Sequence, residues 1–338
     1  MAKNLAFHSA AKLARAFRKR KISPVEVAKA CLAQMEAHEK SVNAMALVDA
    51  KTTLAMAAAS EARWKQGEPL SPIDGVPTLI KDLLLVKGWP TLRGSKTVER
   101  NQAWDQDAPS VARLREAGTV FMGLTTTPEF GWKGVTDSPL TGITCNPWNL
   151  DRTPGGSSGG AAAGLVAGYG ALSIGTDGGG SIRIPASFSG VFGLKPSFGR
   201  VAAFPPSAFG TLAHVGPMAR SVEEASLMLN VMAKPDVRDW FSLPQDDRDY
   251  SKGLGKGVKG LRVAFAPAMY ETDIAPDVAK AVRAAVEVAL LGRRRIARPS
   301  RRPLDVADAG GDGAEDRIEV GDDVVLAADH QAEAALEA

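Results

Sequence analysis

The stretch SVARLREAGTVFMGL, residues 110–124, decides the fold class because it joins a short helix to a buried strand. Ser110 is expected to cap the helix, and Gly118 to end it. The apolar run Val120–Leu124 has the length and composition of a strand buried in a sheet. A helix that returns the chain to a buried strand is the repeating unit of an α/β fold.

Two elements on the N-terminal side continue this alternation. Residues 23–26, Ser-Pro-Val-Glu, form a capping box with proline at the first helical position. The apolar residues that follow at helical spacing predict a helix over about 24–38. The turn-forming residues 74–77 then lead into the apolar run Thr78–Ile80, directly before Lys81.

The C-terminal side repeats the pattern. The small residues of 161–170 suit a helix packed very closely against its neighbours, and residues 171–175 suit a short strand. Later elements are a helix opened by a second capping box at 221–224, a strand over 261–265 and a helix from Pro276 to about Leu290. Helices alternate with strands throughout, so the sequence predicts an α/β fold with a largely buried sheet.

The composition changes abruptly at Leu291. Six arginines fall between Arg293 and Arg302, and eleven acidic residues are scattered from Asp305 to Glu337 without helical or strand periodicity. Such a segment has too little apolar surface to offset the entropy lost on ordering. We expect residues 1–290 to form the folded domain. Residues 291–338 are expected to be a disordered charged tail or the product of a shifted reading frame.

The overall composition argues against several classes of protein. The net charge of +3 comes from 41 basic and 38 acidic residues, a balance too even to predict nucleic-acid binding. The chain contains no apolar segment of about 18 residues, which predicts no membrane span, no secretory signal and a cytoplasmic location. Two distant cysteines and four isolated histidines predict neither a metal nor a cofactor; these are Cys31, Cys145, His8, His38, His214 and His330.

Between Gly155 and Ser181, eleven of 27 residues are glycine, a density that favours close backbone approach and positive φ angles. A phosphate-binding P-loop would need a lysine that this segment lacks. The Gly-x-Ser-x-Gly pattern at 155–159 matches a nucleophile elbow, but loop-like residues precede it where a strand is required. A third interpretation is a serine activated by a lysine whose pKa is lowered by burial. Lys81 follows an apolar run, and Asp82 beside it is expected to help fix its position.

Three motifs occur in an order that resembles the amidase signature family. They are GVPTLIKD at 75–82, GGSSGG at 155–160 and GTDGGGSIR at 175–183, and the runs NPWN at 146–149 and GVFGLKP at 190–196 are also similar to the family. The resemblance covers residues from about 5 to 290. It implies a mixed β-sheet core covered by helices on both faces. Because family domains continue well beyond residue 290, it also implies that the C-terminal part is missing.

The resemblance assigns three catalytic residues. It implies that Ser181 is the nucleophile, that Ser157 is a bridging serine with a cis peptide bond to Gly156, and that Lys81 is the base. Ser157 and Ser181 lie 24 positions apart, as the family's pair does. Lys81 would take a proton from Ser157, which would take one from Ser181 during attack on the amide carbonyl.

The resemblance also suggests roles for residues around Ser181. The backbone N–H groups expected to bind the oxyanion are those of Gly178, Gly179, Gly180 and Ser181. The residues expected to hold this loop in shape are Thr176, Asp177 and Arg183. Ser158 either supports the loop through its hydroxyl or is a small residue at a crowded position, and the second interpretation is preferred.

Other conspicuous side chains are expected to be structural. The tryptophans are interpreted as packing or loop anchors; they are Trp89, Trp104, Trp132 and Trp148. Cys145 has no neighbour that would activate a thiolate. His214 is interpreted as a hydrogen-bonded loop histidine in preference to a pocket residue.

The function implied is hydrolysis of a carboxylic amide C–N bond through an acyl-enzyme, with a small-molecule amide as substrate. One alternative is the glutaminase component of a tRNA-dependent amidotransferase, which would need partner subunits. Residues 182–185 read Ile-Arg-Ile-Pro where those glutaminases usually have Ile-Arg-Gln-Pro, which favours a stand-alone enzyme. A second alternative is an inactive truncated fragment. The sequence does not determine the oligomeric state, and a homodimer is left open.

Overall fold

The computed structural model describes residues 5–257, 265 and 274–291. Contacts divide the chain into two units, and residues 5–251 are the described part of the first. The second unit contains residues 252–257 and the helix α8 (Pro276–Leu291) among its described residues. The functional motifs all lie in the first unit, which is therefore described in detail.

The first unit contains seven α-helices among its described residues. These are α1 (Ala10–Arg18), α2 (Pro24–Val42), α3 (Ala50–Gln66), α4 (Pro109–Glu116), α5 (Gly159–Val166), α6 (Arg183–Ser189) and α7 (Val222–Met232). Three short 3-10 helices accompany them: η1 (Leu5–Phe7), η2 (Glu129–Gly131) and η3 (Gly210–Leu212).

A six-stranded mixed sheet forms the centre of this unit. Its strands, in spatial order, are β1 (Met45–Leu47), β3 (Val120–Thr125), β2 (Pro77–Lys81), β6 (Leu172–Asp177), β8 (His214–Ala219) and β7 (Phe192–Gly193). Strand β2 runs parallel to β3 and β6, whereas the other pairings are antiparallel. A separate hairpin joins β4 (Asp137–Ser138) to β5 (Gly142–Ile143). The prediction of a mixed α/β fold is confirmed.

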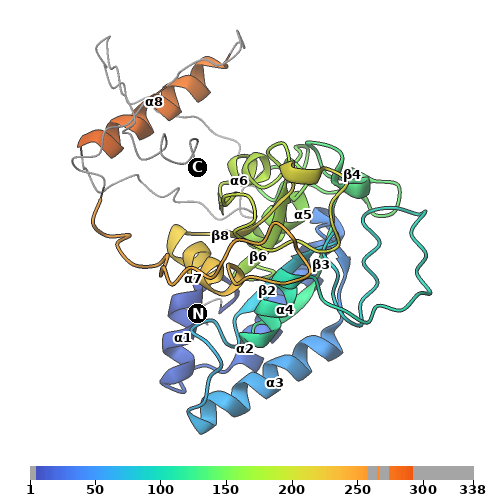
Figure 1. Ribbon diagram of the computed structural model, residues 1–338, viewed down its shortest axis with the longest axis vertical. Helices are drawn as coiled ribbons and strands as arrows, with labels where there is room; N and C mark the ends of the chain where they lie inside the picture. Colours follow the sequence, from blue (N-terminus) through green and yellow to red (C-terminus); the bar gives the residue numbers. More distant parts are fainter. Residues whose placement is uncertain (1–4, 258–264, 266–273, 292–338) are drawn as a thin grey trace. The chain divides into compact units, whose positions relative to one another are not determined.

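Helices pack in two groups around the sheet (Figure 1). The N-terminal helices and α7 contact one another and the strands, and their core includes Phe17, Trp64, Phe121 and Met228. Helices α5 and α6 form a second, smaller cluster with Leu165, Ile182 and Met218. The predicted close packing of the small-residue helix is also found. A Cβ at Gly164 of α5 would lie 2.8 Å from Leu79 of β2.

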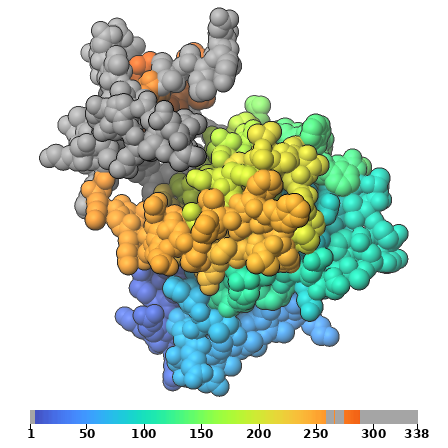
Figure 2. All heavy atoms as spheres, viewed as in Figure 1, coloured from blue at the N-terminus to red at the C-terminus, as the bar shows by residue number. Residues whose placement is uncertain are grey.

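The segment after α7 lies along the surface of the first unit, and is orange in Figure 2. Three hydrogen bonds join it to residues near position 200, and one of them is donated by the Arg200 side chain to the Pro244 carbonyl at 3.2 Å. The Leu243 N–H donates to the Gly199 carbonyl at 2.9 Å, and the Ala203 N–H donates to Asp239 at 2.8 Å. This segment therefore supports the outer side of the chain that precedes β8.

The capping boxes differ in how completely they form. At α2, the Ser23 hydroxyl accepts the Glu26 N–H and the Glu26 carboxylate accepts the Ser23 N–H, as predicted. The helix continues to Val42, four residues beyond its predicted end. At α7, Ser221 accepts the Glu224 N–H, but the Glu224 carboxylate instead accepts the Ala10 N–H at the start of α1.

Several sequence predictions need correction. Ser110 is not a cap, because α4 begins at Pro109, whose missing N–H suits the first helical position. The helix predicted over 161–170 begins at Gly159 and ends at Val166. The strand predicted over 261–265 and the tail after Leu291 lie outside the described residues, apart from position 265. Across the described residues, no helix is both long and apolar enough to cross a membrane.

Candidate active site

The site lies at the carboxyl edge of the parallel strands. Strand β2 ends at Lys81 and β6 ends at Asp177, and their register pairs Ile80 with Ile174. Parallel strands place their carboxyl ends at one edge, where α/β proteins commonly bind ligands. Ser157 immediately precedes Ser158, the N-cap residue of α5, and this helix packs against β2. The sheet thus brings together motifs separated by 76 to 100 positions.

The Lys81 amino group lies among three hydroxyls. Its Nζ is 2.7 Å from Ser157 Oγ, 2.8 Å from Ser158 Oγ and 2.9 Å from Thr176 Oγ1. The side chain is completely buried. Burial holds the Lys81 pKa well below its ordinary value, and the negative charge of Asp177 only partly opposes this effect.

The hydrogen-bond pattern limits which hydroxyl can donate to a neutral Lys81 amine. A neutral amine has two N–H donors and one lone pair, so one of the three hydroxyls must donate to it. Ser158 Oγ already donates to the Thr176 carbonyl at 3.2 Å and accepts the Thr176 N–H at 3.3 Å. The donor to Lys81 is therefore Ser157 or Thr176.

These contacts also correct the preferred interpretation of Ser158. Its hydroxyl contacts Lys81 and both backbone groups of Thr176, and its N–H donates to the Ser181 carbonyl at 3.1 Å. Ser158 is therefore a connecting residue between β2, β6 and the Ser181 loop. A small side chain without a hydroxyl could not make the contacts to Lys81 and Thr176.

The peptide bond between Gly156 and Ser157 is cis, as the resemblance implied. The chain is tightly enclosed here, since a Cβ at Gly156 would lie 2.5 Å from the Val135 carbonyl oxygen. Thr136 ties the two ends of this turn together. Its Oγ1 donates to the Gly155 carbonyl at 2.8 Å and accepts the Gly159 N–H at 3.1 Å. Sequence reasoning did not identify Thr136.

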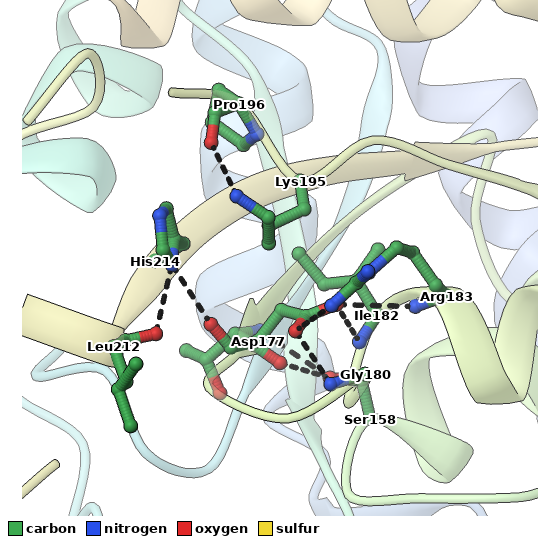
Figure 3. A network of polar contacts seen from close by, with 10 residues as sticks. Ser158, Asp177, Gly180, Ile182, Arg183, Lys195, Pro196, Leu212 and His214 are labelled. Carbon is green, nitrogen blue, oxygen red and sulfur yellow. Dashed lines mark hydrogen bonds and ion pairs between the residues drawn. The ribbon is translucent and has the colours of Figure 1, made fainter. Parts of the chain in front are cut away.

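The loop from Asp177 to Arg183 is folded around the Asp177 carboxylate (Figure 3). Arg183 donates two hydrogen bonds of 2.9 Å to this carboxylate, which also accepts the N–H groups of Gly180 and Ile182. Burial raises the Asp177 pKa, but Arg183 and the two N–H groups outweigh it and bring the pKa to about 2. The expectation that Asp177 and Arg183 hold the loop in shape agrees with this geometry.

One expected oxyanion donor is already used. The Gly180 N–H donates to Asp177 Oδ1 at 2.7 Å, so it is not free to bind a substrate oxygen. The N–H groups of Gly178, Gly179 and Ser181 make no hydrogen bond to any described residue. Crowding is not the reason for glycine at 179 either, because a Cβ there would meet no atom within 4 Å. Gly180 needs to be glycine because its φ is +117°.

A cavity of about 200 Å³ opens beside Ser157 and Ser181. Ser181 is half-buried, and its hydroxyl makes no hydrogen bond within the described part of the chain. The cavity is also lined by Gly178 and Gly179, but not by Gly180. Most of its wall is apolar and includes Leu83, Leu84, Phe130, Phe204, Phe209 and Val215.

Of two polar residues in this wall, one was predicted correctly only in part from the sequence and the other was missed. His214 begins β8 and lines the cavity, with Nδ1 2.8 Å from the Leu212 carbonyl and 3.2 Å from that of Asp177 (Figure 3). It is therefore both hydrogen-bonded and a pocket residue. Arg93, which sequence reasoning missed, also lines the cavity.

Asp82 has a different role from the one expected. Its carboxylate accepts the N–H groups of Leu92 at 2.9 Å and Gly94 at 3.0 Å, and makes no hydrogen bond to Lys81. Burial raises the Asp82 pKa to about 6, although these N–H groups and the charge of Arg93 lower it in part. Asp82 therefore holds the 92–94 segment against the end of β2.

The aromatic and sulfur residues follow the predictions with one exception. Trp89 is buried and donates to Asp49, and Trp148 donates to the Ser189 carbonyl, as anchors do. Trp132 instead is 76% exposed and stacks on Phe209 at a centroid distance of 5.1 Å.

Burial raises the pKa of both cysteine thiols, to about 12 for Cys31, so neither is an activated thiolate. The described residues contain no cluster of His, Cys, Asp or Glu suited to a metal.

Comparison with known proteins first defines the class. A solved structure of a bacterial aryl acylamidase from the amidase signature enzymes superposes with a TM-score of 0.76 and 33% sequence identity, covering 84% of this chain and 59% of that one. A family model described as Amidase matches residues 26–294. The chain therefore belongs to the amidase family.

Curated relatives carry two different names. A glutamyl-tRNA(Gln) amidotransferase subunit from Chloroflexus aggregans is 39% identical over 268 residues, which are 79% of this chain and 55% of the relative. An acylamidase from Rhodococcus erythropolis is 41% identical over 276 residues, which are 81% of this chain and 58% of the relative. The chain spans little more than half the length of these relatives.

Proposed function

We propose that this chain hydrolyses a linear carboxylic amide, with Ser181 as nucleophile, Ser157 as bridging serine and Lys81 as base. The observation that carries the proposal is the buried Lys81 amine 2.7 Å from the Ser157 hydroxyl, with a pKa lowered by burial. A lowered pKa keeps the amine neutral over more of the pH range, so its lone pair can accept a proton. Membership of the amidase family supports this assignment.

The proposed reaction forms and breaks one acyl-enzyme. Ser181 Oγ bonds to the amide carbon while its proton passes to Ser157 Oγ, and the Ser157 proton passes to Lys81 Nζ. The tetrahedral intermediate then breaks its C–N bond, and the same relay returns a proton to the departing amine. Water, activated through the same groups, cleaves the ester at Ser181 and releases the acid.

The proposed oxyanion donors are the backbone N–H groups of Gly178, Gly179 and Ser181. This assignment is supported by the position of the three residues, which line the same cavity as Ser157. Removing one such donor typically raises the barrier by about 2.7–4 kcal/mol. Asp177 acts indirectly, because its carboxylate shapes the loop that presents these groups.

Glutamine hydrolysis within an amidotransferase is the alternative favoured by the name of the Chloroflexus relative. Ile184, at the position where those glutaminases usually have glutamine, supports the stand-alone activity instead. The predominantly apolar cavity wall also suits an alkyl or aryl amide better than glutamine. Release of ammonia from L-glutamine, compared with hydrolysis of an anilide, separates the two functions.

Fluorophosphonate labelling followed by peptide mapping tests the nucleophile directly. We expect the label on Ser181, and we expect Ser181→Ala to abolish both labelling and anilide hydrolysis. Ser187→Ala is a matched control, because Ser187 is exposed on α6 and outside the cavity. Unchanged hydrolysis by Ser181→Ala would refute the mechanism.

The inactive-fragment alternative needs a separate measurement. Thermal unfolding of the purified 338-residue chain, followed by circular dichroism, should show one cooperative transition if the first unit folds. Absence of such a transition, together with absence of labelling at any serine, would support the fragment alternative. Cooperative unfolding with Ser181-dependent turnover would exclude it.

A further inference from the structure

Among the described residues, Arg93 is a cation without a hydrogen-bonding partner in the wall of the catalytic cavity. It is half-buried and makes no side-chain hydrogen bond or ion pair with the described part of the chain. Four other arginines of the first unit each donate two hydrogen bonds to one carboxylate; these are Arg63, Arg115, Arg183 and Arg238. Arg93 is therefore available to bind a ligand.

The backbone around Arg93 is fixed from two sides. On one side, the Asp82 carboxylate accepts the N–H groups of Leu92 and Gly94. On the other, the Arg93 carbonyl accepts the Phe130 N–H at 2.8 Å. Arg93 itself has a φ of +58°, an uncommon conformation for this residue type that surrounding contacts must maintain. The position of its Cα is thus determined before any ligand binds.

The charge of the cavity wall indicates what Arg93 would bind. The other ionised group lining the described cavity is Asp177, whose carboxylate is already paired with Arg183. The ring of His214 is held by two carbonyls, and most remaining wall residues are apolar. A guanidinium that loses water in such a site needs an anionic partner, and its planar geometry matches a carboxylate.

We propose that Arg93 binds a carboxylate carried by the amide substrate, so that the enzyme prefers anionic amides over neutral ones. This inference rests on the proposed function. It names a specificity-determining residue and a substrate class: amides with an apolar body and one carboxylate at a distance from the scissile bond. Asp82 is the corresponding positioning residue, because it holds the segment that carries Arg93.

Paired substrates test the preference. In the first pair, glutaryl p-nitroanilide carries a carboxylate on its acyl side, and valeryl p-nitroanilide is the neutral counterpart. In the second pair, 4-acetamidobenzoate carries the carboxylate on its amine side, and 4-acetamidobenzamide is the neutral counterpart. We expect the wild-type chain to prefer the anionic member of one pair, and Arg93→Gln to lower kcat/KM for that member by about 10- to 100-fold. The neutral member should change less than about twofold, and Arg93→Lys should restore part of the loss.

A second arm separates this inference from the proposed function. Binding of glutarate and of 4-aminobenzoate to Ser181→Ala is measured by calorimetry, with and without Arg93→Gln. Arg100→Gln is the matched control, because Arg100 is exposed and lies outside the cavity. Weaker anion binding only in the Arg93 variant supports the inference even if turnover fails for another reason.

Failure of the Arg93 inference and failure of the proposed amide hydrolysis give different results. If amides are hydrolysed through Ser181 but Arg93→Gln changes the anionic and neutral substrates equally, the inference is wrong and the function stands. If no amide is hydrolysed through Ser181, the proposed function is wrong. In that case an anion affinity unchanged by Arg93→Gln overturns the inference as well.

Discussion

Replacing Asp177 by asparagine should unfold the loop that carries Ser181 more easily and slow catalysis. The carboxylate is buried, accepts two hydrogen bonds from Arg183, and accepts the N–H groups of Gly180 and Ile182. Asparagine has nearly the same shape but no charge, and its amide nitrogen cannot accept a hydrogen bond. At least two of these hydrogen bonds would therefore be lost or weakened.

The magnitude follows from the Asp177 pKa. A pKa of about 2 against an ordinary value of 3.8 means that the folded protein stabilises the charged carboxylate over the neutral acid by about 2 kcal/mol. Because the pKa is lowered, this stabilisation is present above the unfolded value of 3.8 and is lost as the pH falls through about 2. The difference in unfolding free energy between wild type and Asp177→Asn should thus stay constant from pH 8 to about pH 5 and shrink between about pH 5 and pH 2.

Differential scanning calorimetry and steady-state kinetics measure the two consequences. At pH 7 we expect Tm to fall by about 4–8 °C. We expect kcat to fall about 100-fold, because a displacement of about 1 Å in a catalytic loop has effects of that size. Arg183→Gln should have a smaller effect, since the Arg183 side chain is 54% exposed and the carboxylate keeps its backbone donors. If Asp177→Asn leaves kcat within twofold of wild type, the carboxylate does not position the Ser181 loop.

Three further predictions concern the base, the Ser157 turn and the join between α1 and α7. Burial lowers the Lys81 pKa, so kcat/KM should rise with pH through a pKa below 10.5. Lys81→Arg should be inactive at every pH. A wild-type kcat/KM that does not change with pH would contradict the role of Lys81 as base. Gly156→Ala should lower the unfolding free energy by about 1–3 kcal/mol in urea titrations, because the added Cβ would lie 2.5 Å from a backbone oxygen. Gly179→Ala, where a Cβ meets no atom within 4 Å, is its stability control and should change the free energy by less than about 0.5 kcal/mol. Glu224→Ala should lower the unfolding free energy by about 3 kcal/mol, because it removes the acceptor of the Ala10 N–H and a negative charge near the partly buried Arg220. A loss below about 1 kcal/mol would show that the join contributes little.

Local sequence patterns correctly predicted elements whose contacts lie within a few residues. The capping box at Ser23 and the continuous apolar runs of β2 and β3 are examples, because caps and strand burial follow from neighbouring residue types. The second capping box failed to form completely because a distant residue competes for the same carboxylate. The Glu224 carboxylate binds Ala10, which is 214 positions away, in place of completing its own capping box.

The sequence by itself determined the family, the mixed α/β class and the residues proposed for catalysis, because the Lys81, Ser157 and Ser181 motifs require particular side chains in a particular order. Only the tertiary structure decided how the surrounding groups are used. The Gly180 N–H is bound by Asp177, the Ser158 hydroxyl connects three segments, and Asp82 holds the loop that presents Arg93 to the cavity. The physical reason is that each donor or acceptor can be used only a limited number of times. Which partner it meets depends on how the sheet brings distant loops together.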